Sequence, residues 1–364
     1  MQIKDVISEI ERFAPAVYQE SYDNSGLLVG NKDTEVTGVL LSLDCVESII
    51  DEAIKLKCNL IIAHHPIIFG GLKRLNGNNY VERTVIKAIQ NNIAIYAAHT
   101  NVDNVKAGVN AKIAEKLGLT KLKILSPKKH LLKKLVTFAP KDHAEKVRTA
   151  LFEAGAGEIG NYDNCSFNSD GLGTFKGNDS TNPFIGEKNK LSEEAEVRIE
   201  VIFEAVKEQN ILQNLFATHP YEEVAHDIYL LENHYQNVGS GMIGEFEKAM
   251  PETDFLTLVK STFGPKFLKH SPILNKDVKK VAFCGGSGAF LIKNAIRSGA
   301  DAYISADIKY HEFFDADGKI LIVDTGHFEN EQFTPEIFYG IIHKKFTTFA
   351  TYLSKINTNP VNYF

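Results

Sequence analysis

Short apolar runs that alternate with amphipathic helical patterns constrain the fold of this chain more than any other feature. In the first third, residues 39–43, 60–63 and 93–98 have the composition and length of buried strands, and residues 46–56 and 81–90 between them have helical periodicity. Parallel strands need crossover helices and are usually covered on both faces. This order therefore predicts a three-layer α-β-α unit with a mainly parallel sheet.

The last third of the chain shows the same alternation of strand-like and helix-like segments. Residues 278–283, 302–305 and 320–323 read as strands, and the segments after the first and last of them read as helices. We therefore expect residues 1–126 and 243–364 to form one discontinuous α/β domain. The loops that carry chemistry should then gather at the carboxyl ends of its strands.

The middle of the chain has a different order. Strand-like and helix-like patterns there follow one another as β-α-β-β-α-β, which is typical of a ferredoxin-like unit. We expect residues 127–242 to be an inserted α+β domain, with its exit near Val238-Gly239-Ser240-Gly241. The polar segment 178–190, which contains Pro183, is predicted to be a mobile loop.

Composition excludes several classes of function. The chain of 364 residues has a formal net charge of −6 and no lysine/arginine-rich run, so a nucleic-acid partner held by phosphate contacts is not indicated. No apolar stretch approaches the ~20 residues of a membrane-spanning helix, and the amino terminus has no signal pattern, so a cytoplasmic protein without a membrane partner is expected. The four cysteines form no CxxC pair, which favours free thiols over a thiolate zinc site.

A pair of histidines, His64-His65, follows the apolar run 60–63. Adjacent side chains on a strand point to opposite faces, so they cannot easily bind one metal from one face. At a strand terminus, where the backbone turns, they can reach two neighbouring sites. The pair therefore indicates a polynuclear metal centre at the edge of a sheet.

Three further clusters of potential ligands also follow predicted strands. They contain His99 and Asp103, then Asp307, and finally His327 and Glu331, whose spacing of four places both on one face of a helical turn. The set His64, His65, Asp103, His327 and Glu331 is too large for one catalytic zinc and suits two metals sharing a carboxylate. Imidazole with carboxylate suits zinc, iron, manganese or nickel. We expect His99 to orient a ligand or act as a general acid or base.

Two other motifs have more than one interpretation. The turn Cys284-Gly285-Gly286-Ser287-Gly288 is either an anion cradle for phosphate or a plain tight turn. In the insertion, His219 and His226 could bind metal, but no convincing third ligand accompanies them. The motif Thr218-His219-Pro220-Tyr221-Glu222-Glu223 is therefore interpreted as structural or as part of an interface.

Together these motifs resemble the dinuclear-metal-centre family of GTP cyclohydrolase I type 2 homologs, also called Nif-three-like proteins. The resemblance covers essentially the whole chain and rests on these segments: Asp23-Asn24-Ser25-Gly26-Leu27-Leu28-Val29-Gly30, His64-His65-Pro66, His99-Thr100-Asn101-Val102-Asp103, Cys284-Gly285-Gly286-Ser287-Gly288 and Gly326-His327-Phe328-Glu329-Asn330-Glu331. Tyr22 stands where the family usually has tryptophan, outside the ligand set.

The resemblance implies two divalent ions held by His64, His65, Asp103, His327 and Glu331, with Glu331 as the bridge. It also implies a PII/CutA-like insertion, as in the family's longer members, and a ring-shaped homohexamer. Its name implies hydrolytic opening of the GTP ring, although nothing in the sequence reads a guanine base. We expect a metal-dependent hydrolase of a small, nucleotide-like, phosphate-bearing substrate. The alternative is a metal-binding regulatory protein without turnover.

Overall fold

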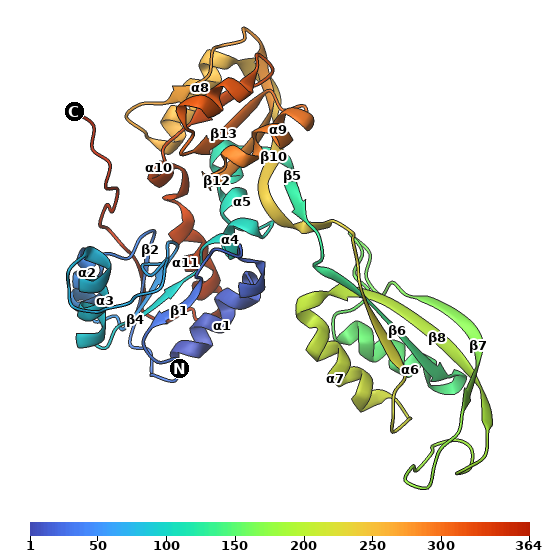
Figure 1. Ribbon diagram of the computed structural model, residues 1–364. Coiled ribbons are helices and arrows are strands. Elements are labelled where there is room, and N and C mark those ends of the chain that lie inside the picture. Colours follow the sequence, from blue (N-terminus) through green and yellow to red (C-terminus); the bar gives the residue numbers. More distant parts are fainter. The chain divides into compact units, whose positions relative to one another are not determined.

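The computed structural model describes residues 1–364 and divides them into two compact units (Figure 1). Unit 1 comprises Met1–Pro127 and Gln236–Phe364, and unit 2 comprises Lys128–Tyr235. The expected insertion boundary at residue 242 falls inside a long strand, β10 (Tyr235–Pro251). Gly241, which we expect near the exit of the insertion, lies within this strand and has a φ of +64°, a backbone conformation that glycine adopts readily. The glycine-rich stretch is therefore part of unit 1.

Unit 1 contains a five-stranded sheet in the order β1-β4-β3-β2-β15. Its strands are β1 (Gly26–Val29), β4 (Ala94–Ala97), β3 (Leu60–Ala63), β2 (Val39–Ser42) and β15 (Thr351–Leu353). All neighbouring pairs are parallel except β1 with β4. Every residue of β2, β3 and β4 is buried, as the continuous apolar runs predict for a sheet covered on both faces.

Helices cover both faces of this first sheet. On one face, α2 (Glu47–Leu56) and α3 (Tyr80–Gln90) pack their apolar sides against β2 and β3 in a core that includes Leu40, Ile49 and Ile61. On the other face lie α1 (Ile3–Phe13) and α11 (Thr334–Lys345), which pack against each other (Figure 1). The three-layer arrangement expected from the sequence is confirmed here.

Unit 1 also contains a second sheet, of six strands, in the order β11-β14-β13-β12-β10-β5. Its strands are β11 (Lys269–His270), β14 (Leu321–Asp324), β13 (Ala302–Ala306), β12 (Asp277–Ser287), β10 and β5 (Thr120–Lys128). The central strands β12, β13 and β14 are parallel, β10 is antiparallel to β12, and β11 is antiparallel to β14. The two outer thirds of the chain thus contribute two sheets, not one.

The remaining helices of unit 1 surround the second sheet and join it to the first. They are α4 (Thr100–Asn104), α5 (Val109–Leu117), α8 (Glu252–Phe263), α9 (Ile292–Arg297) and α10 (His327–Glu331), with the 3-10 turns η1 (Ala16–Tyr18), η3 (Ala289–Leu291) and η4 (Tyr310–Ala316). Apolar residues of α9 pack on one face of the sheet, while α5, α8 and α10 contact β12. No helix in the protein is both long and apolar enough to cross a membrane.

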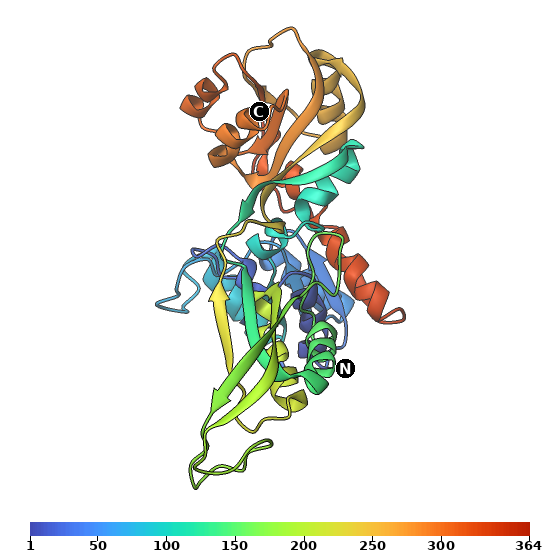
Figure 2. The ribbon, with the colours of Figure 1, turned by 90° about the vertical axis from the view of Figure 1, so that its right-hand side faces the viewer.

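Unit 2 has its own sheet and its own core. The strands lie in the order β7-β8-β6-β9, all antiparallel, and comprise β6 (Leu132–Pro140), β7 (Phe167–Phe175), β8 (Ser192–Glu204) and β9 (His226–Leu230). Helices α6 (Lys141–Glu153) and α7 (Glu208–Thr218), the latter preceded by the turn η2 (Ala205–Lys207), pack on one face. The segment between β7 and β8 forms a loop beyond the ends of both strands (Figure 2). The element order is the β-α-β-β-α-β order expected for this region.

Candidate metal centre

The histidine pair lies at the carboxyl end of β3, where the backbone turns out of the sheet. His64 is completely buried, and its Nδ1 donates a hydrogen bond to the carbonyl oxygen of Ala98 at 2.9 Å. The Nδ1 of His65 donates to Asp44, which follows the end of β2, at 2.7 Å. The two rings lie with centroids 4.9 Å apart, tilted by 46°. Both imidazoles are therefore held in fixed but different orientations.

A second group of ligands comes from α10, which begins two residues after β14. His327 and Glu331 lie one helical turn apart, and Glu331 is only 2% exposed. The Oε2 atom of Glu331 lies 2.9 Å from Nε2 of His65 and 3.0 Å from Nε2 of His327. Asp307, which follows β13, accepts a hydrogen bond from Nδ1 of His327 at 2.7 Å. A residue 266 positions away in sequence thus meets the histidine pair.

Asp103 of α4 completes the cluster on the side of His64. Nε2 of His64 lies 3.6 Å from Oδ1 of Asp103 and 3.7 Å from Oε1 of Glu331. These separations are too long for hydrogen bonds, and both Nε2 of His64 and Oδ1 of Asp103 are buried without a hydrogen-bond partner. Buried polar atoms are normally paired, so the arrangement leaves room for a cation between them.

His99 faces the same cluster. Its Nδ1 donates to Asp23 at 2.7 Å, and Asp23 is also bound by the backbone N–H and the hydroxyl of Thr100. The ring centroid of His99 lies 5.2 Å from that of His64 and 5.5 Å from that of His65. The sequence places His99 next to the ligands, and the structure agrees, with its Nε2 unengaged by any of these hydrogen bonds.

All four histidines share one hydrogen-bonding pattern. In each, Nδ1 faces an atom that can only accept, either a backbone carbonyl or a carboxylate, so Nδ1 carries the hydrogen. Neutral imidazole in this tautomer presents a lone pair on Nε2. Metal-ligating histidines usually donate their other N–H to such a partner, which fixes the ring and raises its basicity.

The cluster contains three sets of side chains, and within each set the potential ligand atoms all lie within 4.8 Å of one another. They are His64 with Asp103 and Glu331, His65 with His327 and Glu331, and His64 with His65 and His99. Glu331 belongs to the first two sets and offers a different oxygen to each. The donor set of nitrogen and carboxylate oxygen suits a divalent transition metal.

The charged groups of the cluster shift the pKa values of one another. Burial alone would lower the pKa of His65, but Asp44 and Glu331 raise it to about 9. Burial and the neighbouring charge of Glu331 raise the pKa of Asp103 well above its usual value. Burial also favours protonation of Glu331, yet His327 and His64 hold its pKa well below the usual range. The carboxyl groups of Asp103 and Glu331 therefore lie close together in one buried space, where the negative charge of one disfavours ionisation of the other.

The cluster opens into a cavity of about 650 Å³. Tyr22, Phe69 and Phe290, each more than half exposed, line it together with the glycine turn at the carboxyl end of β12. A Cβ atom on Gly286, where φ is +61°, would lie 2.5 Å from Oε1 of Glu331. The amide of Gly285 is already bound to Asn110. Glycine at 286 therefore allows the backbone to lie close to Glu331, and the amide of Gly285 is not available to an anion. Both observations favour a tight turn over an anion cradle.

The structure brings together all five residues predicted as ligands, and His99 with them. They come from the carboxyl ends of strands in two sheets, whereas the sequence predicts that they gather at one edge of a single sheet. Asp23 and Asp44, which orient His99 and His65, were not identified as site residues. Asp44 directly follows the residue after β2, so its position at a strand end is a signal that could have found it.

The histidines of unit 2 have structural partners. Nε2 of His219 donates to the carbonyl of Phe138 at 2.9 Å, and Nδ1 accepts from the N–H of Tyr221 at 3.1 Å. Both ring nitrogens are therefore used, which agrees with the structural interpretation of this motif. Nδ1 of His226 is bound to the carbonyl of Val224.

All four cysteines are free thiols, and three are buried.

Comparison with known proteins places this geometry in a family. The protein-family model described as "Duf34/NIF3 (NGG1p interacting factor 3)" matches residues 1–360. A protein of Halalkalibacterium halodurans named "GTP cyclohydrolase 1 type 2 homolog" is 42% identical over 325 residues, covering 88% of this chain and 87% of its own. A Bacillus subtilis protein of the same name is 38% identical over 366 residues, covering 99% and 98%.

A solved structure shares the fold along its whole length. "The Crystal Structure of Bacillus cereus protein related to NIF3" superposes with a TM-score of 0.87 at 38% identity, covering 100% of this chain and 99% of that one. A Staphylococcus aureus protein, SA1388, superposes with a TM-score of 0.80 at 30% identity, with the same coverage. The chain therefore belongs to the Duf34/NIF3 family.

Proposed function

We propose that the cluster is a dinuclear metal centre and that the chain is a metal-dependent hydrolase acting on a small, nucleotide-like substrate. The single observation that carries the proposal is the pair of buried, unpartnered atoms, Nε2 of His64 and Oδ1 of Asp103, facing the buried carboxylate of Glu331. Such atoms are costly to bury without a partner. A divalent cation satisfies both and relieves the repulsion between Asp103 and Glu331.

The ligands divide naturally between two ions. His64 and Asp103 would hold one and His65 and His327 the other, with one oxygen of Glu331 directed to each. A divalent ion at such a site supplies Lewis-acid activation of water and of the bond to be cleaved. The donor set suits zinc, iron, manganese or nickel.

Other residues of the cavity would handle protons and orient the rings. The ring of His99 lies beside those of His64 and His65, and its Nδ1 is bound to Asp23, so Nε2 can accept a proton from water while the carboxylate stabilises the resulting imidazolium. Asp44 and Asp307 hold His65 and His327 by the same kind of hydrogen bond. The three carboxylates thus keep the imidazoles in the tautomer that leaves Nε2 available.

The aromatic rim supports a substrate with a planar ring. Tyr22 and Phe69 lie with centroids 6.4 Å apart, and Phe69 lies 6.2 Å from the ring of His99. Every nucleobase has a flat aromatic face, so any of the bases can stack on such side chains. The names of the relatives make opening of the guanine imidazole ring of GTP one candidate reaction. Phosphoester or amide hydrolysis would use the same arrangement.

Turnover and metal content test the two parts of the proposal separately. Metal-loaded protein is incubated with a panel of nucleotides and phosphoesters beside the His64→Ala/His65→Ala variant. We expect at least one substrate to turn over in the wild type and not in the variant. Turnover equal in both, or in neither, would contradict the hydrolase assignment, whereas the metal content of each protein reports on the centre itself.

A metal-binding regulatory protein without turnover is the second candidate. The independent core of unit 2, with a pocket of its own, favours it because a sensing unit needs its own ligand site. Metal-loaded protein that binds two ions but hydrolyses nothing in the panel would select this function.

We also propose, from the family resemblance, that the chain assembles into a homohexamer located in the cytoplasm. Light scattering of the purified protein should then give six times the mass of one chain. A monomer mass would contradict the ring.

A further inference from the structure

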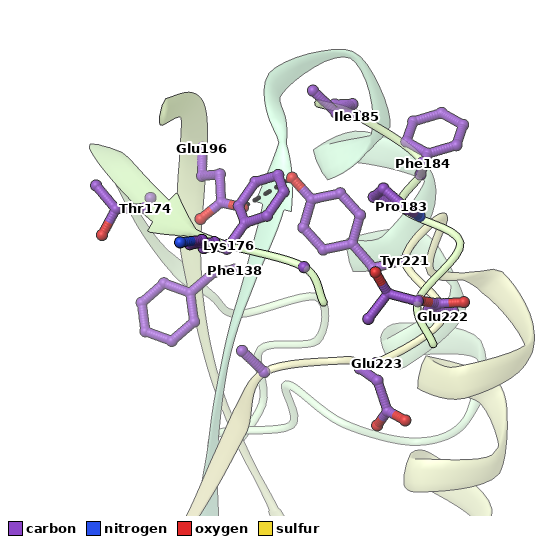
Figure 3. Close-up of a pocket in the computed structure, with 15 residues that line it drawn as sticks. Phe138, Thr174, Lys176, Pro183, Phe184, Ile185, Glu196, Tyr221, Glu222 and Glu223 are labelled. Carbon is purple, nitrogen blue, oxygen red and sulfur yellow. Dashed lines mark hydrogen bonds between the residues drawn. The ribbon is translucent and has the colours of Figure 1, made fainter. Parts of the chain in front are cut away.

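Unit 2 contains a pocket that takes no part in the proposed metal chemistry. Its volume is about 300 Å³, at the lower end of the range for small-molecule sites. Aromatic side chains from four parts of the unit form its walls. Phe175 lies at the end of β7. Figure 3 labels the other three, which are Phe138 of β6, Phe184 of the loop after β7 and Tyr221 after α7. The Tyr221 ring lies with its centroid 6.1 Å from Phe175 and 6.4 Å from Phe184, at interplanar angles of 53° and 52°. Three rings thus surround one space at steep angles.

The polar group of the pocket is a buried carboxylate. Glu196 of β8 is 8% exposed, and its Oε1 accepts a hydrogen bond from the Tyr221 hydroxyl at 2.9 Å (Figure 3). No donor of the protein reaches its other oxygen, Oε2. A Cβ atom on Gly173, on the neighbouring strand, would lie 2.2 Å from that oxygen. Glycine at 173 therefore makes room for the carboxylate, and the pocket retains an acceptor without a partner.

The walls are held in place before any ligand arrives. The backbone N–H of Asn182 donates to Glu222 at 2.8 Å, which ties the loop carrying Phe184 to the segment after α7. Phe184 also packs edge-on against His143, with centroids 5.4 Å apart. His219 fixes the backbone of Tyr221 and of Phe138 through its two ring nitrogens. A pre-organised site loses less conformational entropy on binding.

The charges that line the pocket are mainly negative. Glu196, Glu222 and Glu223 contribute carboxylates, and the single cation is Lys176. Lys176 is exposed, and its amine lies on the Thr174 side, away from Tyr221 (Figure 3). Aromatic faces attract cations, and ring cages recognise ammonium groups in this way. We propose that this pocket binds a small organic cation whose ammonium group lies among Phe175, Phe184 and Tyr221 and pairs with Glu196.

A comparison of two probes of equal shape tests the charge requirement. The full-length protein is titrated by calorimetry with choline and with its neutral isostere 3,3-dimethylbutan-1-ol. We expect choline to bind at least about tenfold more tightly, because cation–π and ionic contacts act only on the charged probe. This comparison uses the wild-type chain, so it does not depend on whether a variant folds.

Two matched variants then locate the site. Glu196→Gln removes the negative charge while keeping the shape and an acceptor for Tyr221, and should weaken choline binding by about tenfold or more. Glu153→Gln removes an exposed carboxylate of α6 outside the pocket and should leave it unchanged. Both variants should retain the metal content of the wild type.

Three results would overturn the proposal. They are equal affinity for choline and its isostere, unaltered choline affinity in Glu196→Gln, and no binding of choline or tetramethylammonium up to millimolar concentrations. Each would leave the metal centre of unit 1 untouched, since the two sites share no residue.

Discussion

The two units each bury a glutamate, and the surroundings of Glu331 and Glu196 differ. Glu331 lies among imidazole nitrogens from both sheets, and each of its oxygens faces a different histidine set. Glu196 lies among aromatic rings, with one oxygen bound by a tyrosine hydroxyl. A buried carboxylate is costly unless it is paired. The ring nitrogens beside Glu331 suit a metal ion, whereas the rings beside Glu196 suit an organic cation.

The difference extends to how each site is assembled. The candidate metal centre joins residues far apart in the chain, such as His65 and Glu331, which are 266 positions apart, and each is placed by the end of a strand. The pocket of unit 2 is built within residues 138–225, from three strands and two loops. The first depends on the packing of two sheets, and the second depends on one small core. Changes in one unit should therefore leave the other site intact.

Glu331→Ala should produce the largest effect. It removes the carboxylate shared by both metal sets, and loss of one member of a buried charged group typically costs about 3–5 kcal/mol. We expect metal affinity to fall at least about 100-fold, measured by elemental analysis after dialysis against a metal buffer. Choline binding in unit 2 serves as the internal control and should not change. Full metal content in this variant would show that Glu331 is not a ligand.

A pair of core variants tests whether the units are independent. Leu40 of unit 1 and Leu135 of unit 2 are both fully buried, in separate cores. Truncation of either to alanine should destabilise its own unit by about 3 kcal/mol. Hydrogen exchange followed by mass spectrometry should show faster exchange within residues 128–235 for Leu135→Ala and outside them for Leu40→Ala. Equal acceleration in both units for either variant would contradict independence.

Asp44→Asn should have a smaller effect on the metal centre. Asp44 contacts His65 but not the other ligands, and loss of such an orienting carboxylate usually weakens metal binding about 10–100-fold. Asp33→Asn, an exposed aspartate paired with Lys4, is the matched control. A competition titration with a chromogenic chelator measures both. Identical affinities would mean that the hydrogen bond from His65 does not fix the ligand.

Tyr221→Phe should have the smallest effect. It keeps the ring of the unit 2 pocket but removes the hydrogen bond to Glu196, which is worth about 1 kcal/mol. Chemical denaturation should report this loss, with metal content unchanged. An unaltered unfolding free energy would indicate that water replaces the hydroxyl without cost.

Much of the candidate metal site could be predicted from the sequence because its potential ligands directly follow strand ends. Apolar runs locate β3, β4 and β14, and the histidines and carboxylates directly after them are visible as motifs. Periodicity does not specify which strands pair, so it could not distinguish one sheet from two. The glycines of β10 made this part of the strand resemble a linker, because glycine is disfavoured in strands and typical of linkers.

The pocket of unit 2 could not be predicted in the same way. Phe138, Phe175 and Phe184 are ordinary apolar residues at unrelated spacings, and any of them could equally belong to a core, whereas Tyr221 lies in the motif interpreted as structural or as part of an interface. His219 belongs to the same motif, but its role depends on the contact with Phe138, and the role of Gly173 depends on the contact with Glu196. Only the folded chain reveals either contact.

Anomalous X-ray diffraction from metal-loaded crystals locates the bound ions directly. We expect two peaks in each chain, one among His64, Asp103 and Glu331 and one among His65, His327 and Glu331. Crystals that contain the metal but show no anomalous peak within this cluster would contradict the proposed metal centre.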